Sequence, residues 1–472
     1  MKKTAAIIGG GTIGGGWAAR FLIMGWDVVI YDPADGAEEV FQDMLANARR
    51  SLPGLSDVML PDEGHLLFSS SLKEAVEHAD WIQESVPERL ELKHDVFSQI
   101  QSCCREEAII ASSTSGFRPT QLQENSIRPQ QIIVAHPFNP VYLIPLVELV
   151  GAVEVVQVAK DLLTGIGMRP LHVRKEIDAH IADRLLEAVW REGLWLVNDG
   201  VATTQEIDDA ISYGFGLRWA QMGLFETYRI AGGKAGMVHF ISQFGPALKW
   251  PWTKLMDVPE LTQELIQKIS DQSDAQSGQY SIRELERIRD KNLVGIMRSL
   301  KNGDWAVGEL LNAFDDHLTS TENIDISQPI LTIKRSVPMD WTDYNGHMNE
   351  SRYGQVFSDA ADVIMKIIGA DGAYVNTGLS YFTVNTNIQF INECEAGDVI
   401  EVITRIQEGK GKKLRLYHEM RHAKGDLAAT ADQLLIHVDL KTRKSCEPMP
   451  DIVKRMSQIA QAHALLPETD HL

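Results

Sequence analysis

The sequence predicts an α/β protein that begins with a doubly wound parallel sheet, continues as an all-helical region and ends in a separate α+β region. Three observations support this prediction. Short apolar runs alternate with helical segments up to about residue 175, helical spacing dominates from residue 181, and strand-like runs return after residue 330. We therefore expect a nucleotide-binding domain at 1–178, a helical domain at 179–318, a linker at 319–329 and an α+β domain at 330–455.

The N-terminal elements follow a strand, helix, strand order. Thr4–Ile8 is a short apolar run, Gly15–Met24 has helical spacing, and Asp27–Tyr31 is again strand-like. Further strands are expected at residues 81–82, 108–112 and 131–136, with helical segments between them. This alternation is typical of a parallel sheet covered by helices on both faces.

After about residue 180 the predicted elements are first only helices and then mainly strands. Helices are expected at residues 181–198, 204–210, 263–269 and 281–300, and the turn-rich stretch Thr319–Pro329 is the expected linker. Beyond it we expect a strand at 330–337, an amphipathic helix at 349–368 and four strands within 379–440. One long helix and several strands predict an α+β domain.

Composition narrows the possible partners. The chain has 472 residues, 44% of them hydrophobic, and a formal net charge of −20, which disfavours nucleic acid and anionic membrane surfaces. The four cysteines show no CxxC pairing, so we expect neither a metal site nor a secreted disulfide framework. The start, Met1-Lys2-Lys3 and an apolar run, mimics a secretory leader, but cleavage would remove the first strand of the nucleotide-binding unit. We expect a cytoplasmic protein without a targeting signal.

A glycine-rich turn follows the first strand. Gly9, Gly11 and Gly14, with Thr12 and Ile13 in the same turn, form G-x-G-x-x-G at the start of a helix, where backbone N–H groups can meet a pyrophosphate. Asp32 ends the next strand, where its carboxylate would bind ribose hydroxyls and repel a 2′-phosphate. The pattern predicts NAD rather than NADP. The alternative is a structural glycine turn with a capping aspartate.

A second motif, His136-Pro137-Phe138-Asn139-Pro140, is followed by Glu148. An imidazole beside a carboxylate can take the proton of a substrate hydroxyl while the neighbouring carbon gives hydride to a nicotinamide. Ser115 follows one predicted strand and His136 ends the next, and such carboxyl ends are where open α/β sheets bind ligands. The chain is therefore predicted to be an alcohol dehydrogenase.

Over roughly residues 1–310 these motifs resemble the 3-hydroxyacyl-CoA dehydrogenase superfamily. The resemblance implies a Rossmann domain, a helical dimerisation domain and a homodimer. It implies that His136 is the catalytic acid/base and Glu148 its orienting carboxylate. By position it also implies polar substrate contacts at Ser115 and Asn139, and a nicotinamide-side segment containing Glu88 and Lys93.

The chain departs from that superfamily near the substrate. Asp183 stands where the acyl-CoA enzymes usually have asparagine. The acidic residues Glu38, Glu39 and Asp43 occupy a region where those enzymes often have lysines. Extra acid and nearby aromatic rings suit a quaternary ammonium group. The pattern as a whole is also similar to dehydrogenases of L-carnitine, including the run Gly214-Phe215-Gly216-Leu217-Arg218-Trp219-Ala220. This second resemblance implies L-carnitine as substrate, with Asp183 as a substrate-binding residue. The alternative for Trp190, Trp195 and Trp219 is ordinary helix packing.

The C-terminal region has its own signature, Asp340-Trp341-Thr342-Asp343-Tyr344-Asn345-Gly346-His347-Met348-Asn349. Over roughly residues 330–455 it resembles the 4-hydroxybenzoyl-CoA thioesterase group of hotdog folds. The resemblance implies that Asp343 activates water or attacks the carbonyl of a short acyl-CoA thioester, with betainyl-CoA expected. The alternatives are a solvated turn aspartate at Asp343, a helix N-cap at Asn349 and a packing role for His347.

Two other functions remain open at this level. One is an NAD-dependent dehydrogenase of another small 3-hydroxy acid or 3-hydroxyacyl-CoA, with a hotdog domain that hydrolyses or binds acyl-CoA. The other is a ligand sensor without catalytic activity, which the presence of His136, Glu148 and Asp343 disfavours.

Overall fold

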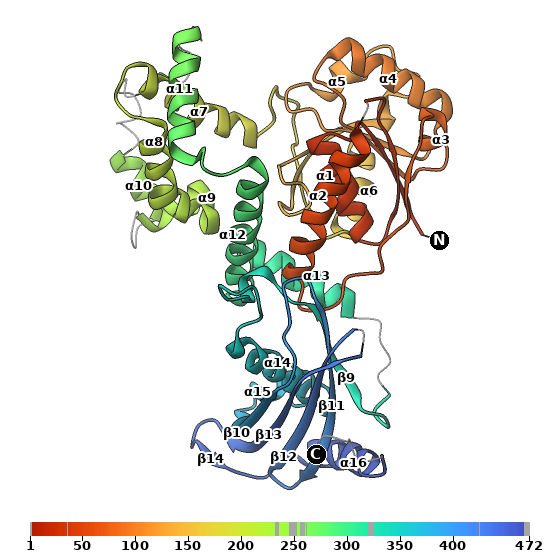
Figure 1. Ribbon diagram of the computed structural model, residues 1–472, viewed down its shortest axis with the longest axis vertical. Helices are drawn as coiled ribbons and strands as arrows, with labels where there is room; N and C mark the ends of the chain where they lie inside the picture. The colour runs from red at the N-terminus through yellow and green to blue at the C-terminus, as the bar shows by residue number, and fades with distance from the viewer. Residues whose placement is uncertain are drawn as a thin grey trace. The chain divides into compact units, whose positions relative to one another are not determined.

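The structure, a computed structural model, consists of two compact units (Figure 1). The first contains residues 1–48 and 61–312, and the second contains residues 49–60 and 313–472. The structure describes residues 2–466 apart from 35, 232–235, 245–252, 255–259, 261, 320–324 and 424. Part of the expected linker at 319–329 therefore lies outside the described residues, and the expected domain boundaries stay predictions.

The first unit opens with an eight-stranded sheet in the order β3-β2-β1-β4-β5-β6-β7-β8. Its strands are β1 (Thr4–Ile8), β2 (Asp27–Tyr31), β3 (Leu66–Phe68), β4 (Trp81–Glu84), β5 (Ile109–Ser112), β6 (Ile132–Pro137), β7 (Leu146–Val150) and β8 (Arg169–His172). All neighbours run parallel except β6 and β7, which are antiparallel. The expected Rossmann sheet is thus confirmed. The sequence predicted neither the strands β3, β7 and β8 nor the antiparallel pairing of β6 with β7.

Helices cover both faces of this sheet. They are α1 (Thr12–Ile23), α2 (Ala37–Ser51), α3 (Leu72–Val76), α4 (Leu90–Cys103), α5 (Pro119–Leu122) and α6 (Val153–Thr164). In Figure 1, α3, α4 and α5 gather on one face, and they share an apolar core with the strands that includes Val76, Phe97, Ile110 and Leu122. Burial of such apolar side chains stabilises the sheet by about 25 cal/mol per Å².

A helical region completes the first unit. It contains α7 (Ala182–Asn198), α8 (Thr204–Ala210), a π-helical turn (Ile211–Phe215), α9 (Gly216–Ala231), α10 (Gly236–Phe244), α11 (Gln263–Ser277) and α12 (Ile282–Asn302). Thr203 and Ser281 cap α8 and α12 in capping boxes with Glu206 and Glu284. The expected helices are therefore all present.

The second unit is built around one long helix and an antiparallel sheet. Its helices are α13 (Val307–Thr319, which begins in the first unit), α14 (Glu350–Ile368), α15 (Gly372–Val375) and α16 (Pro450–His463). The strands are β9 (Ile330–Ser336), β10 (Leu379–Phe390), β11 (Val399–Lys410), β12 (Lys413–His422), β13 (Leu427–Asp439) and β14 (Lys444–Ser445). The main sheet has the order β10-β13-β12-β11-β9. This is the expected hotdog architecture.

The core of the second unit lies between α14 and the sheet. Helical spacing brings Val356, Phe357 and Ala360 onto one face of α14, where they pack with Val402 and Met420 of the sheet. Residues 49–60, which include the last three residues of α2, also belong to this unit. There the Asp57 carboxylate lies 2.5 Å from the Arg335 guanidinium, and Ser56 Oγ donates to Asp315 at 2.6 Å.

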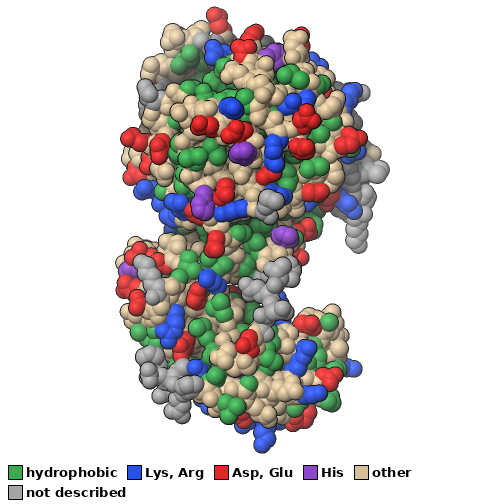
Figure 2. All heavy atoms as spheres, turned by 90° about the vertical axis from the view of Figure 1, so that its right-hand side faces the viewer, with side chains coloured by type: hydrophobic (Ala, Val, Ile, Leu, Met, Phe, Trp, Pro, Cys, Tyr) green, Lys and Arg blue, Asp and Glu red, His purple; other side chains and the backbone are tan. Residues whose placement is uncertain are grey.

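On the face drawn in Figure 2, basic side chains are scattered among acidic ones and do not form a stripe. Within the described residues, no helix is both long and apolar enough to cross a bilayer. The same residues contain no cluster of three or more His, Cys, Asp or Glu side chains arranged to hold a metal ion.

Candidate active sites

The glycine turn between β1 and α1 requires glycine for steric reasons. Gly9 has φ +96°, and a Cβ there would lie 2.7 Å from the Ser85 carbonyl oxygen. A Cβ on Gly14 would lie 1.8 Å from the Gly9 carbonyl oxygen. Gly11, by contrast, is the N-cap of α1, is exposed and has open space around it. The turn therefore leaves the N-terminus of α1, with Thr12 and Ile13 in its first turn, accessible to an anion.

Asp32 lies beside this turn, as the sequence predicted. Its Oδ2 accepts a hydrogen bond from Gly10 N at 2.6 Å, and its Oδ1 accepts one from Ala34 N at 2.8 Å. The carboxylate thus fixes the turn and carries a negative charge next to it. These features fit a dinucleotide without a 2′-phosphate, and they show that the capping interpretation describes part of what Asp32 does.

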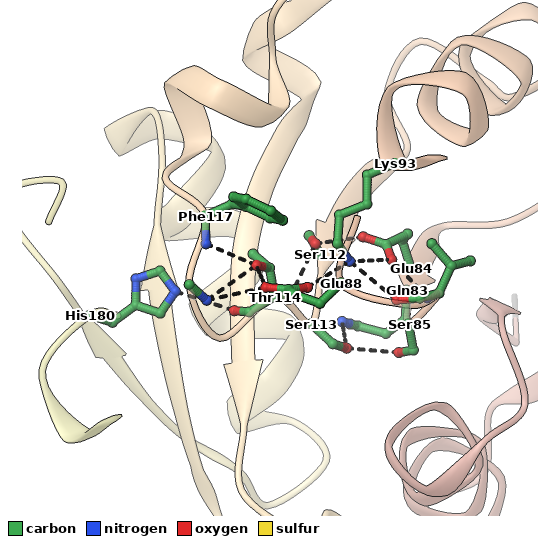
Figure 3. Close-up of polar contacts among 12 residues, drawn as sticks. Gln83, Glu84, Ser85, Glu88, Lys93, Ser112, Ser113, Thr114, Phe117 and His180 are labelled. Carbon is green, nitrogen blue, oxygen red and sulfur yellow. Dashed lines mark hydrogen bonds and ion pairs between the residues drawn. The ribbon is translucent and has the colours of Figure 1, made fainter. Parts of the chain in front are cut away.

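An ion-pair network with two buried members, Lys93 and Glu84, and one exposed member, Glu88, lies at the carboxyl end of β4 (Figure 3). The Lys93 ammonium, 1% exposed, is 2.8 Å from Glu84 Oε1 and 3.2 Å from Glu88 Oε2. Glu84 also accepts from Ser112 Oγ at 2.5 Å, and Glu88 accepts from Thr114 Oγ1. Burial opposes ionisation of Glu88, but the Thr114 hydrogen bond and the Lys93 charge outweigh it and lower the pKa of Glu88. Lys93 and Glu88 were predicted, whereas Glu84 was not.

Glu84 was missed because no neighbouring residue in the sequence marks it as part of a site. It is the first residue of Glu84-Ser85-Val86-Pro87-Glu88, and its spacing to Lys93 was the only available signal. The carboxylate is completely buried and also accepts from Val86 N at 2.8 Å. We infer that it holds Lys93 and the loop after β4 in place.

His136 and Glu148 face each other across the antiparallel strands β6 and β7. His136 Nδ1 lies 3.0 Å from Glu148 Oε2. Because a carboxylate can only accept, Nδ1 carries the hydrogen, and Nε2 keeps a lone pair for a substrate proton. The structure therefore brings the two predicted residues into the arrangement that general base catalysis requires.

Glu148 is fully buried and saturated with hydrogen bonds. Its Oε1 accepts from Ile181 N at 2.9 Å and from Ala182 N at 3.0 Å, at the start of α7. Burial opposes ionisation, but the hydrogen bonds from His136, Ala182 and Ile181 outweigh it and lower the pKa of the Glu148 carboxyl. Glu148 therefore stays charged and orients His136.

Two more side chains lie close to His136. Asp183 Oδ2 is 3.6 Å from His136 Nε2, and burial, aided by the charge of Glu148, raises the pKa of Asp183. The His180 ring centroid is 5.5 Å from that of His136, and its Nε2 lies 3.3 Å from the Thr114 carbonyl oxygen (Figure 3). His180 was not predicted, because a histidine without a motif is usually structural.

The backbone before α7 is unusual where it approaches this site. Ala179 and His180 have φ values of +58° and +48°, a conformation that side chains other than glycine rarely adopt. The two left-handed residues turn the chain so that the next two N–H groups, of Ile181 and Ala182, meet Glu148. Strain of this kind persists where surrounding contacts hold it in place.

The other predicted substrate contacts lie at the rim. Ser115 and Asn139 are exposed, and the Phe138 ring packs edge-on against His136 with centroids 4.8 Å apart. Trp190 is 61% exposed, and the Trp195 ring is covered by the Lys254 ammonium at 3.9 Å. The face of the Trp195 ring is thus already occupied by the Lys254 ammonium group. Trp190 is too exposed for the helix-packing alternative to describe it in this structure.

The Asp343 loop in the second unit is a tight turn. Asp343 Oδ1 accepts from Asn345 N at 2.8 Å and from His347 N at 3.4 Å. Asn349 Oδ1 accepts from Ser351 N at 3.0 Å, so Asn349 is the N-cap of α14. The structure therefore confirms the alternative that Asn349 is the N-cap of the long helix.

The loop also brings together acidic and imidazole groups. His347 Nε2 lies 3.2 Å from Glu393 Oε2, in the segment between β10 and β11. Glu393 was not predicted, because it lies far from the Asp343 signature in the sequence. The structure thus places a second carboxylate and a histidine in the same loop region as Asp343.

Comparisons with known proteins first define the class. Residues 4–177 match the 3-hydroxyacyl-CoA dehydrogenase, NAD binding domain, and residues 180–271 match the 3-hydroxyacyl-CoA dehydrogenase, C-terminal domain. Residues 337–456 match the thioesterase-like superfamily. The chain is therefore a dehydrogenase with an NAD-binding domain, joined to a thioesterase-like domain.

Full-length relatives narrow this class to one family. An L-carnitine dehydrogenase/betainyl-CoA thioesterase of Ruegeria pomeroyi is 60% identical over 98% of this chain and 96% of its own length. A protein of Agrobacterium fabrum with the same description is 52% identical over 98% of this chain and 96% of its own length. The chain belongs to the L-carnitine dehydrogenase/betainyl-CoA thioesterase family.

One solved structure supports the fold of the dehydrogenase part. A 5-formyl-3-hydroxy-2-methylpyridine 4-carboxylic acid 5-dehydrogenase, described as an NAD⁺-dependent dismutase, superposes with a TM-score of 0.54 at 30% identity. The match covers 64% of this chain and 99% of that one. The two proteins therefore share the architecture of the first unit.

Proposed function

We propose that this chain carries out two reactions, the NAD⁺-dependent oxidation of L-carnitine to 3-dehydrocarnitine and the hydrolysis of betainyl-CoA to betaine and CoA. The observation that carries the first activity is the His136–Glu148 pair, at 3.0 Å, with Asp183 beside its free nitrogen. The relatives that match over nearly the whole chain are described by both activities.

The dehydrogenase mechanism follows from the hydrogen-bond pattern. Glu148 fixes the His136 tautomer, so Nε2 can take the proton of the substrate 3-hydroxyl. Once His136 is protonated, the buried Glu148 charge stabilises the imidazolium. NAD⁺, when bound, supplies the hydride acceptor. The glycine turn would hold its pyrophosphate, Asp32 its ribose, and the Glu88–Lys93 segment its nicotinamide side.

Asp183 supports a cationic substrate. Its side chain is 19% exposed, so it lies between the buried His136 and solvent. A carboxylate there attracts a trimethylammonium group and repels an anionic one. We therefore assign Asp183 to substrate binding, with Ser115 and Asn139 as rim contacts for the polar parts of the substrate.

We assign the hydrolase step to the Asp343 loop. Asp343 is the proposed base or nucleophile, and backbone N–H groups at the start of α14 would stabilise the oxyanion. The contact between His347 Nε2 and Glu393 Oε2 favours a second candidate, in which Glu393 orients the His347 imidazole and the imidazole activates the water. Both candidates predict thiol release from a short acyl-CoA.

We also propose a cytoplasmic homodimer. Large apolar side chains are exposed on α7 and α9, among them Leu185, Leu186, Leu217 and Phe225. Exposed apolar surface of this kind is typical of an interface with another chain. Free thiols at all four cysteines fit a reducing compartment.

A substrate panel tests the proposal. NAD⁺ reduction is measured with L-carnitine, 3-hydroxybutyrate, 3-hydroxybutyryl-CoA and gulonate at matched concentrations, and thiol release is measured with short acyl-CoA thioesters. We expect L-carnitine to be oxidised fastest. Faster turnover of 3-hydroxybutyryl-CoA would contradict the substrate, and no thiol release from any thioester would favour an acyl-CoA-binding module.

A further inference from the structure

We propose that Asp183 is also the group through which the proton collected by His136 leaves the dehydrogenase site. The inference rests on the proposed function in one respect, that His136 accepts the proton of a hydroxyl group. Each oxidation then leaves one proton on His136 Nε2. Because the His136 side chain is only 5% exposed, that proton needs a neighbouring group to reach solvent.

Glu148 does not provide this exit. It is completely buried, and its two oxygens already accept from His136 Nδ1 and from the backbone N–H groups of Ile181 and Ala182. Those hydrogen bonds outweigh burial and lower the pKa of Glu148, so it is a poor proton acceptor. It also contacts the wrong nitrogen, Nδ1.

His180 does not provide it either. Its side chain is fully buried, and its Nε2 donates its hydrogen to the Thr114 carbonyl oxygen. The remaining nitrogen, Nδ1, is buried without a hydrogen-bond partner among the described residues, so a proton placed there has no group to pass it on to solvent. Burial lowers the pKa of His180, and the neighbouring His136 charge lowers it further. A second imidazolium beside the first is therefore unfavourable.

Asp183 meets the geometric requirements. Its Oδ2 lies 3.6 Å from Nε2, which a small rotation or one bridging water converts into a hydrogen bond. Its side chain is 19% exposed, so it reaches from the buried imidazole to solvent. The charged groups that act on it are His136, Glu148, His180 and Glu187. Burial raises the pKa of the Asp183 carboxyl, which makes its carboxylate a better proton acceptor than an ordinary exposed one.

The proton balance is simple. The substrate O–H bond breaks as the Nε2–H bond forms, and the carbon-bound hydride reduces NAD⁺. The Nε2–H bond then breaks as an O–H bond forms on the Asp183 carboxylate, and a water or buffer base removes that proton. NAD⁺ is the only oxidant, and both His136 and Asp183 return to their starting states. An asparagine at this position could not carry the proton.

The test uses the full-length Asp183→Asn protein at saturating substrate. The control is Asp178→Asn, which removes the same charge at a position five residues before Asp183. The Asp178 side chain is exposed and pairs with Arg118. Stopped-flow absorbance gives the rate of NADH formation in the first turnover. Steady-state rates are then measured at constant pH and ionic strength while the concentration of imidazole buffer is raised.

At saturating substrate, where weaker substrate binding no longer limits the rate, we expect the first turnover of Asp183→Asn to stay within about threefold of the wild type, because hydride transfer precedes the lost proton transfer. Its steady-state rate should fall roughly tenfold in dilute buffer and recover as imidazole replaces the missing carboxylate. The wild type and Asp178→Asn should not respond to imidazole.

Other outcomes overturn the inference. Equal loss in the first turnover and in steady state, without recovery by imidazole, would restrict Asp183 to substrate binding. An unchanged steady-state rate would remove it from the reaction. If the wild type does not oxidise L-carnitine, the proposed substrate fails separately, and the same buffer series with the hydroxy acid that the panel identifies still decides the role of Asp183.

Discussion

Two carboxylates, Glu148 in the first unit and Asp343 in the second, occupy opposite kinds of environment. Glu148 is fully buried, and three donors saturate its oxygens. Asp343 lies in a partly exposed turn, where only one of its carboxylate oxygens, Oδ1, accepts hydrogen bonds from described residues, both from backbone N–H groups. A saturated carboxylate can orient a neighbour but cannot react, whereas one with an open oxygen can act on a substrate. Burial thus separates a positioning role from a reactive one.

The largest expected effect is at His136, the group that Glu148 orients. His136→Ala should lower kcat for L-carnitine oxidation by roughly 10²–10⁴-fold, because the proton acceptor is lost. NAD⁺ affinity should change little, because His136 acts on the substrate proton. Steady-state kinetics and cofactor titration measure the two effects, and a near-normal kcat where chemistry limits turnover would disprove the assignment.

The next effect tests whether Asp343 is reactive. Asp343→Ala should reduce thiol release from betainyl-CoA at least about 10²-fold, while L-carnitine oxidation stays within about twofold. The matched control is Asp325→Ala, because Asp325 makes the same kind of turn, with Oδ1 accepting from Ser327 N at 2.9 Å. Similar losses in both variants would show that the effect is structural.

His347 and Glu393 refine that test. If thiol release survives in Asp343→Ala but is lost in His347→Ala, the water-activating group is His347 and not Asp343. In that case Glu393→Gln should give a smaller loss than His347→Ala, because Glu393 would only orient the imidazole.

Glu148→Gln should have a smaller effect than His136→Ala, roughly tenfold on kcat, because the amide keeps the shape of the carboxylate but loses the charge that stabilises the imidazolium.

The same variant should also change how the stability of the folded protein depends on pH. The pKa of Glu148 is lowered in the folded state, so its ionisation stabilises the protein above the unfolded carboxyl value of about 4.3. That contribution is lost as pH falls through the folded value. Thermal unfolding of the two proteins should therefore converge in acid, and a constant difference would contradict the ionised state.

The smallest expected effect is at Asp32. Asp32→Asn should weaken NAD⁺ binding several-fold and narrow the preference over NADP⁺, because the charge that repels a 2′-phosphate is lost. The amide oxygen can still accept from Gly10 N, so the glycine turn should persist. Cofactor titrations with NAD⁺ and NADP⁺ measure the change. Unchanged selectivity would mean that Asp32 serves the turn alone.

Local sequence patterns determined the elements of both units. Apolar runs and helical spacing identified β1, β2 and the long helix α14, and the glycine spacing identified the nucleotide turn, because these features depend on neighbours a few residues apart. For the same reason, the motif around His136 identified the imidazole that we propose as the catalytic base. No pattern predicted strand β7 or its antiparallel pairing with β6, because the direction in which two strands pair depends on the path of the chain between them.

The tertiary structure alone decided how the charged groups meet. The antiparallel pairing of β6 with β7 sets Glu148 opposite His136, and the left-handed turn at Ala179 and His180 brings Asp183 to the free nitrogen of that histidine. Glu84 and Glu393 became recognisable only through their contacts with Lys93 and His347. Burial and proximity depend on segments far apart in the chain, and these two quantities decide which carboxylate orients, which one can react and which one can carry a proton.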